Sequence, residues 1–246
     1  MTGISTRVLR ARTTVLRAGP RCGILWMFLL YVLRILRVTY IFHPMGPGNI
    51  VGVATPEWDA EFGIIAGEDH GAAALSGVFR YGLRSLKCNE VPQRLIANET
   101  RKKWYDSFLI TGSLSVVREP VKDIIEGLDP GVHQFFPLTI ETKRGKMIEG
   151  PWFAMNVTAR QDSVVMEQSS VNVNKRFPDE LCSFFHDGED RVTVDAGRQS
   201  GLHLWREQRF RGSLLGSDAL MAELKAQKLR FFPRAFRALD LLVEAD

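Results

Sequence analysis

Two stretches of the chain repeat the same order of elements, and this repeat constrains the fold more than any other feature. The first, Leu114 to Pro137, reads LSVVREPVKDIIEGLDPGVHQFFP, and the second, Ser213 to Pro233, reads SLLGSDALMAELKAQKLRFFP. Each predicts a short strand, an amphipathic helix and then a strand that ends in Phe-Phe-Pro. The second stretch lacks three residues at the Asp-Pro-Gly turn. The repeat therefore predicts two related strand-helix-strand halves.

The helices of both stretches are predicted from hydrophobic spacing and from their first residues. Pro120 occupies a first-turn position in the first helix, where proline is tolerated because that N–H has no partner in the helix. Hydrophobic residues then follow at i, i+3, i+4 and i+7, namely Val121, Ile124, Ile125 and Leu128. The second helix has Ser217 as its N-cap. Its hydrophobic face is formed by Leu220, Met221 and Leu224.

Further strands are predicted where β-branched and aromatic residues gather between turn residues. They fall at Arg37–Pro44, Gln93–Glu99 and Pro151–Ala159, while Trp104 to Leu109 predicts a short helix or turn. We therefore expect an α+β fold of mixed sheets with a few amphipathic helices. Residues 45–246 are long enough to form a single domain of this class.

The N-terminal 44 residues form an unassigned extension that contains seven arginines, no lysine and no acidic residue. Removing these seven charges from the net charge of +4 leaves −3 for residues 45–246. A mildly acidic body argues against a basic groove for phosphates, so we expect no nucleic-acid partner.

Within this extension, residues 23–42 are almost all apolar and allow three interpretations. They could anchor the chain in a membrane, although Arg34 and Arg37 would each cost roughly 2.5–3.5 kcal/mol near a helix centre. The true start of the folded protein could instead lie downstream, at Met27 or Met45, or the segment could contain a buried first strand behind a frayed leader. A membrane is expected as a partner only through this segment, and otherwise the sequence favours a cytoplasmic protein. The three cysteines are far apart, which favours reduced thiols.

Motifs that would carry catalysis are missing from the sequence. It contains no G-x-S-x-G, no P-loop and no H-E-x-x-H, and we expect no cofactor, no structural metal and no enzymatic activity. His133 is interpreted as a half-buried, hydrogen-bonded side chain. His186, with Asp187, Glu189 and Asp190, could hold a divalent ion through oxygen ligands, but an acidic hairpin turn is the favoured interpretation.

The segment Trp104, Tyr105 and Asp106 is the candidate protein-binding surface. An acid lies here among aromatic residues, and aromatic side chains are the usual anchors of protein interfaces. The alternative is that Asp106 begins a helix and accepts hydrogen bonds from its first amides.

These residues also carry a resemblance that covers roughly Lys103 to Pro233. The Asp106 region, the helix entry Val117-Arg118-Glu119 and the joint GVHQFFP are similar to the immunity-protein family of polymorphic toxin systems, which has a myxobacterial type example and was formerly a domain of unknown function. Arg118 stands where that family commonly has serine, so a serine cap is missing there.

The resemblance implies an α+β fold and a bacterial protein that binds and neutralises a cognate toxin without catalysis. It supplies no catalytic residues. Two alternatives stay open from the residues themselves: a metal-dependent or small-molecule enzyme centred near His186, and a membrane-tethered adaptor anchored through residues 23–42.

Overall fold

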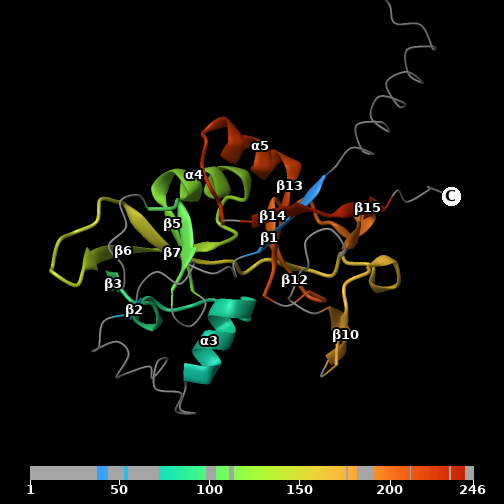
Figure 1. Ribbon diagram of the computed structural model, residues 1–246, viewed down its shortest axis with the longest axis horizontal. Helices are drawn as coiled ribbons and strands as arrows, with labels where there is room; N and C mark the ends of the chain where they lie inside the picture. Colours follow the sequence, from blue (N-terminus) through green and yellow to red (C-terminus); the bar gives the residue numbers. More distant parts are fainter. Residues whose placement is uncertain are drawn as a thin grey trace, which may run out of the picture. The chain divides into compact units, whose positions relative to one another are not determined.

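The repeat predicted from the sequence forms two sheets, each with a helix packed against it (Figure 1). The computed structural model describes residues 38–43, 53–54, 72–97, 104–110, 114–175, 177–181, 191–210, 212–232 and 234–241. All of them belong to the compact unit that runs from Arg37 to Asp246. The predicted α+β class is confirmed, because mixed sheets and a few helices make up this unit.

The first sheet contains six strands in the order β2-β3-β6-β7-β5-β4. Its β3 and β6 are parallel, and every other neighbouring pair is antiparallel. The strands are β2 (Val53–Ala54), β3 (Arg94–Ala97), β4 (Ser107–Leu109), β5 (Ser115–Arg118), β6 (Gln134–Thr142) and β7 (Trp152–Asn156).

The second sheet contains five strands in the order β14-β1-β13-β12-β8. Its β12 and β8 are parallel, and the other pairs are antiparallel. The strands are β1 (Thr39–His43), β8 (Arg160–Gln161), β12 (Leu204–Glu207), β13 (Leu214–Ser217) and β14 (Arg234–Arg237). Since Ile41 and Phe42 in β1 are at most 1% exposed, the interpretation of a buried first strand is confirmed for this segment.

Smaller elements surround the two sheets. Two short pairs form, β9 with β10 and β11 with β15, the first antiparallel and the second parallel. Their bounds, with those of the remaining helices, are β9 (Val173–Asn174), β10 (Phe177–Leu181), β11 (Thr193–Asp195), β15 (Leu239–Leu241), α3 (Ala72–Tyr81), η1 (Cys88–Glu90), η3 (Met166–Gln168) and η4 (Ala196–Arg198). No helix in the described part of the chain is long and apolar enough to cross a bilayer.

The two halves share one topology. In the first, β5 leads through α4 (Glu119–Leu128) to β6, and β7 lies between the two strands. In the second, β13 leads through α5 (Asp218–Ala226) to β14, and β1 lies between them. Both neighbours of each middle strand run antiparallel to it, so each half joins two parallel strands through one helix.

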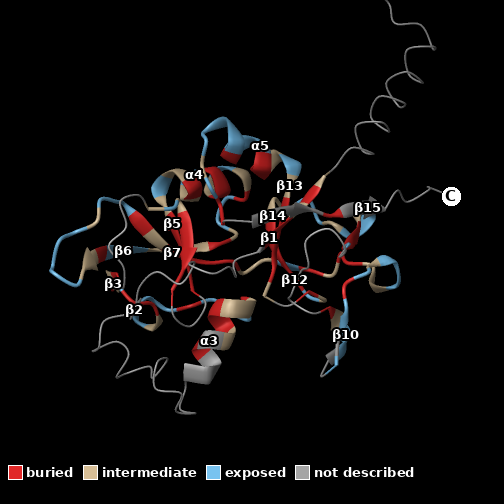
Figure 2. Ribbon diagram, in the orientation of Figure 1, coloured by how far each residue is buried: buried red, intermediate tan, exposed pale blue. Residues whose placement is uncertain are grey.

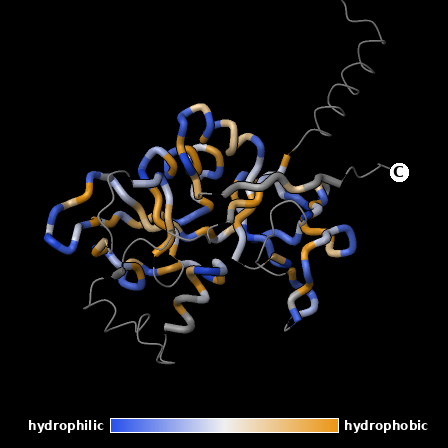
Figure 3. The backbone as a smooth tube through the Cα atoms, in the orientation of Figure 1, coloured by the Kyte–Doolittle hydropathy of each residue, from blue (hydrophilic) through white to orange (hydrophobic). Residues whose placement is uncertain are grey.

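The two helices bury the faces that their sequences predict. Val121, Ile124 and Ile125 of α4 are buried, as are Leu220, Met221 and Leu224 of α5. In Figure 2 these helices carry buried and exposed residues on different sides, and in Figure 3 their tube alternates between hydrophobic and hydrophilic. The buried residues join one core cluster that also contains residues of β1, β5, β7 and β13. The two halves are therefore packed against each other through a common core.

The Phe-Phe-Pro sequence that the two stretches share has a different structure in each half. Phe135 and Phe136 lie inside β6, where Phe135 packs against the helix-side core and Phe136 against the core of the opposite face. Of the two rings, only Phe135 therefore packs on the helix side of the sheet. The prediction that each strand ends in Phe-Phe-Pro was wrong in both halves, because β6 continues past Pro137 to Thr142, and Phe231 and Phe232 precede β14. Phe232 has a φ of 59°, which an extended strand excludes.

Helix α3 is fixed to the second sheet by a buried arginine. Arg206 of β12 donates hydrogen bonds to the main-chain oxygens of Phe79 (2.8 Å) and Arg80 at the end of α3, and to Val157 O (3.1 Å). Cationic donors are favourable at this end of a helix, although burial lowers the pKa of Arg206 to about 9. Gly82 ends the helix at φ 60°, where a Cβ would lie 2.2 Å from Val157 O.

Candidate protein-binding surface

Trp104 and Tyr105, two of the three predicted surface residues, differ in their exposure. Trp104 is half-buried, and its ring centroid lies 5.6 Å from that of Phe108 and 6.1 Å from that of Trp152. It therefore extends the hydrophobic core of the six-stranded sheet. Tyr105 is 37% exposed and is one of the few large hydrophobic side chains at the described surface. Of the two, only Tyr105 has the exposure that an interface anchor needs.

Asp106 links three segments and does not begin a helix. Its carboxylate accepts a hydrogen bond from Arg230 N (3.0 Å) and lies 3.5 Å from the guanidinium of Arg118, while its own carbonyl accepts from Arg118 N (2.9 Å). The next residues form strand β4, so the predicted helix or turn at Trp104–Leu109 was wrong. Asp106 thus lies where the start of α4 meets the segment after α5.

A groove lies between α4 and α5, and the sequence analysis did not predict it. It is a hollow of about 460 Å³. Four of the residues that line it are apolar or lack a side chain: Pro120, Ile124, Gly127 and Leu128. The other four are polar and comprise three carboxylates and an amide: Glu119, Asp123, Glu223 and Gln227. The i, i+4 spacing of the two acids on α4 was the available signal, because it places both on one side of the helix.

The lysines of the two helices do not line this groove. Lys122 contacts Asp123 (Nζ to Oδ1, 3.2 Å), and its ammonium also lies 5.3 Å from the ring of Phe153. Lys225 lies 5.4 Å from the ring of Tyr40, on the side of α5 that faces β1. No lysine or arginine of the described residues lines the hollow. Its charge is therefore negative, with three carboxylates and no cation in the lining.

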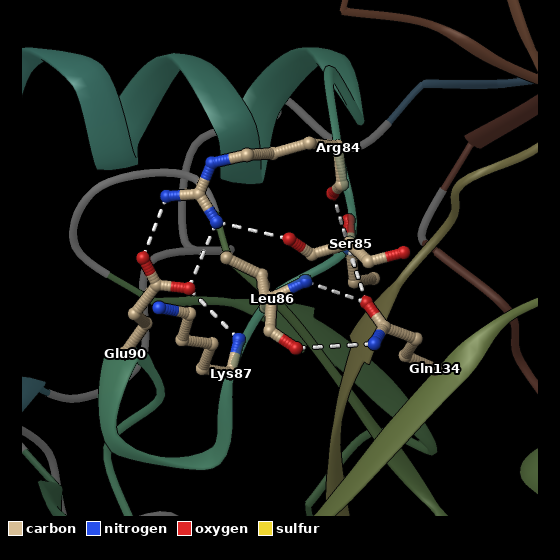
Figure 4. Close-up of polar contacts among 7 residues, drawn as sticks. Arg84, Ser85, Leu86, Lys87, Glu90 and Gln134 are labelled. Atoms are coloured by element: carbon tan, nitrogen blue, oxygen red, sulfur yellow. Dashed lines mark hydrogen bonds and ion pairs between the residues drawn. The ribbon is translucent and has the colours of Figure 1, made fainter.

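A second hollow, of about 400 Å³, lies between the loop after α3 and strand β6. Figure 4 shows how this loop is held. Arg84 forms two hydrogen bonds with Glu90 (2.8 and 2.6 Å), which lower the pKa of that carboxyl to about 2. The amide of Gln134 bonds to both the N–H and the C=O of Leu86 (2.8 and 3.1 Å). The lining has no charged side chain among the described residues.

His133 is fully buried, whereas the sequence predicted a half-buried side chain with a hydrogen bond. Its Nε2 lies 3.6 Å from the carboxylate of Asp129, and neither ring nitrogen has a hydrogen-bond partner among the described residues. Burial lowers the pKa of His133, although Asp129 opposes that shift. The Asp129 carboxylate accepts hydrogen bonds from His203 N (3.0 Å) and Leu204 N (2.8 Å). This cluster joins the turn after α4 to β12 and is a structural joint.

The arrangement around Asp129 does not form a catalytic triad. His203 Nδ1 lies 2.8 Å from Ser217 Oγ, but Asp129 bonds to the main chain of His203 and not to its ring. Ser217 Oγ also accepts from Leu220 N (3.2 Å), because it caps α5. An acid that does not contact the imidazole cannot orient it as a general base.

The predicted acidic turn at His186 lies outside the described residues. In the part of the chain that the structure does describe, no group of three or more His, Cys, Asp or Glu side chains could hold a metal ion. The alternative of a metal-dependent enzyme near His186 is therefore supported by the sequence alone.

A comparison with known protein families identifies this chain as similar to a family of immunity proteins. The model of the immunity protein family (Imm11) matches residues 53–235 of this chain, well over half of its length. The matched range contains both helices and the groove between them, but not β1. None of the curated proteins matches.

Proposed function

The chain belongs to the immunity protein family (Imm11), and on that premise we propose that it neutralises a cognate bacterial toxin by binding the toxin directly. Membership is consistent with the immunity protein of a polymorphic toxin system. The observation that carries the proposal is the extent of this match, which contains β5, α4, β6 and β7 of the first half and β13 and α5 of the second. In this proposal the chain acts as a binding protein and catalyses no reaction.

The proposed binding surface includes the segment Trp104–Asp106, with Tyr105 as its anchor. Tyrosine is enriched in interfaces because it offers a large, rigid surface with one polar end. Asp106 ties this segment to Arg118 at the start of α4, so the surface is supported by rigid neighbours. We expect Tyr105→Ala to weaken toxin binding, with Met147→Ala as a matched control at another exposed hydrophobic residue.

Co-expression tests the proposal in cells. The reading frame next to the gene for this chain is expressed from an inducible promoter, with and without this chain. We expect the neighbour to arrest growth alone and the full chain to restore it. A toxic neighbour that this chain does not relieve would count against the proposal.

A titration of the purified proteins separates binding from catalysis. A binding inhibitor must be present in amounts equal to the toxin, and its effect does not increase with time. An enzyme that modified the toxin would inactivate a large excess and would do so progressively. We expect residual toxin activity to fall linearly and to end at one equivalent; complete loss at about one hundredth of an equivalent would contradict a binding mechanism.

A further inference from the structure

The groove between α4 and α5 combines an apolar floor with an acidic rim. Ile124 is only 8% exposed at its floor, whereas Glu119, Asp123 and Glu223 are exposed at the rim. Its volume of about 460 Å³ lies within the range of roughly 300–1,000 Å³ typical of ligand-binding pockets. The walls come from both halves of the molecule, one helix from each.

The rim carboxylates are available to an outside partner. Neither the Glu119 carboxylate nor the Glu223 carboxylate has a hydrogen-bond or ion-pair partner among the described residues. Among the described residues the Asp123 carboxylate is paired with Lys122, whose ammonium also lies 5.3 Å from the ring of Phe153. Because the carboxylates sit on two packed helices, little main-chain rearrangement is needed before a cation binds.

We propose that this groove is the docking site for a basic segment of the toxin, an inference that rests on the proposed function. An arginine or lysine of that segment lays its methylene stem along Ile124 and Leu128 and directs its charged group to the rim. Long cationic side chains combine these two contacts readily. Charge-assisted hydrogen bonds to carboxylates then orient the guanidinium or ammonium group.

The position of the groove favours this occupant. Arg118, which immediately precedes the rim residue Glu119, contacts Asp106. The exposed Tyr105 immediately precedes Asp106 in the chain, so the ion pair between Asp106 and Arg118 connects the segment of the aromatic anchor to the start of the helix that carries the rim. A hydrophobic anchor beside a charged rim is the usual composition of a specific interface.

The test compares two triple variants that each remove three negative charges from the full chain. The groove variant is Glu119→Gln, Asp123→Asn and Glu223→Gln, and the control is Glu149→Gln, Glu167→Gln and Asp179→Asn, at exposed acids that do not line the groove. The probe is the purified toxin domain from the adjacent reading frame, inactivated in its own active site. Affinity is measured by calorimetry at low and at high sodium chloride, after circular dichroism has verified that both variants are folded.

We expect the groove variant to bind at least about tenfold more weakly than the wild type and to lose most of the salt dependence, while the control changes affinity less than about twofold. Equal weakening in both variants would assign the effect to net charge and overturn the groove. Unchanged affinity in the groove variant would also overturn it, while leaving direct toxin binding intact. A wild-type chain that does not bind the toxin domain would overturn both proposals.

Discussion

The two halves of the molecule share a topology but obtain their middle strand in different ways. In the first half, β7 follows β6 along the chain, so the unit β5-α4-β6-β7 is continuous. In the second half the middle strand is β1, which lies more than 160 residues before β13 in the sequence. The first half can therefore form from local contacts, whereas the second needs a distant strand. Closing so long a loop costs conformational entropy that only the finished sheet recovers.

The largest expected effect comes from weakening that distant strand. Phe42 of β1 is fully buried, and its ring contacts Phe231 with centroids 4.8 Å apart. We expect Phe42→Ala to lower the free energy of unfolding by about 4 kcal/mol, because it leaves a cavity in the core. Urea denaturation followed by tryptophan fluorescence measures this change.

The counterpart in the first half is Met155→Ala in β7, which removes a side chain from the same core cluster. Because Phe42 and Met155 share this core, we expect both variants to unfold in one cooperative transition. A second transition in the Phe42 variant would show that the first half is stable without the second.

The second-largest effect is expected at Asp129, a residue of the first half that joins the two halves. Asp129 is 4% exposed and accepts hydrogen bonds from the main-chain amides of His203 and Leu204 at the start of β12. Asp129→Ala leaves these amides without an acceptor, and we expect a loss of about 3 kcal/mol. The same urea experiment applies, with the exposed Asp123→Ala as the control, for which a change below about 0.5 kcal/mol is expected. Equal losses in both variants would remove the special role of the joint.

The two helix starts give a smaller contrast. Ser217 caps α5 by accepting from Leu220 N, whereas Arg118 at the start of α4 makes no side-chain cap bond. We expect Ser217→Ala to cost about 1 kcal/mol. Arg118→Ala should cost less than about 0.5 kcal/mol, because its ion pair with Asp106 is partly exposed. Thermal unfolding by circular dichroism ranks the two, and a larger loss at Arg118 would reverse the comparison.

What the sequence could predict follows the same division between local and distant contacts. Helices α4 and α5, the cap at Ser217 and the buried faces all depend on residues within a few positions of one another, and these predictions are confirmed. The strands β1, β3 and β7 were also predicted near their observed bounds. The hydrophobic periodicity of a helix and its N-cap depend on residues that are neighbours in the chain, so both can be recognised from a single sequence.

The candidate site depends on distant contacts, and this is why it was largely missed. The groove exists only because α4 packs beside α5, with about ninety residues between them. Nothing in the sequence around Asp106 predicts that the main-chain N–H of Arg230 donates a hydrogen bond to its carboxylate. The protein-binding surface at Trp104–Asp106 stays a prediction. Of its two aromatic residues, Trp104 packs against the core and Tyr105 is exposed at the surface.

The smallest expected effect is a pH dependence that belongs to the first half alone. The stretch KLRFFP has no histidine, whereas the first half buries His133, whose pKa burial lowers. The unfolded state then binds the proton more tightly, so stability should fall as the pH decreases through about 6.5, by less than about 1 kcal/mol between pH 7 and pH 6. The charged groups facing His133 are Asp129 and Glu126, and His203 lies beside Asp129.

Urea midpoints at these two pH values should differ less for His133→Gln than for the wild type, with His203→Gln as control. A wild-type midpoint that does not change with pH, or a difference that persists in the His133 variant, would show that protonation of this joint does not destabilise the fold.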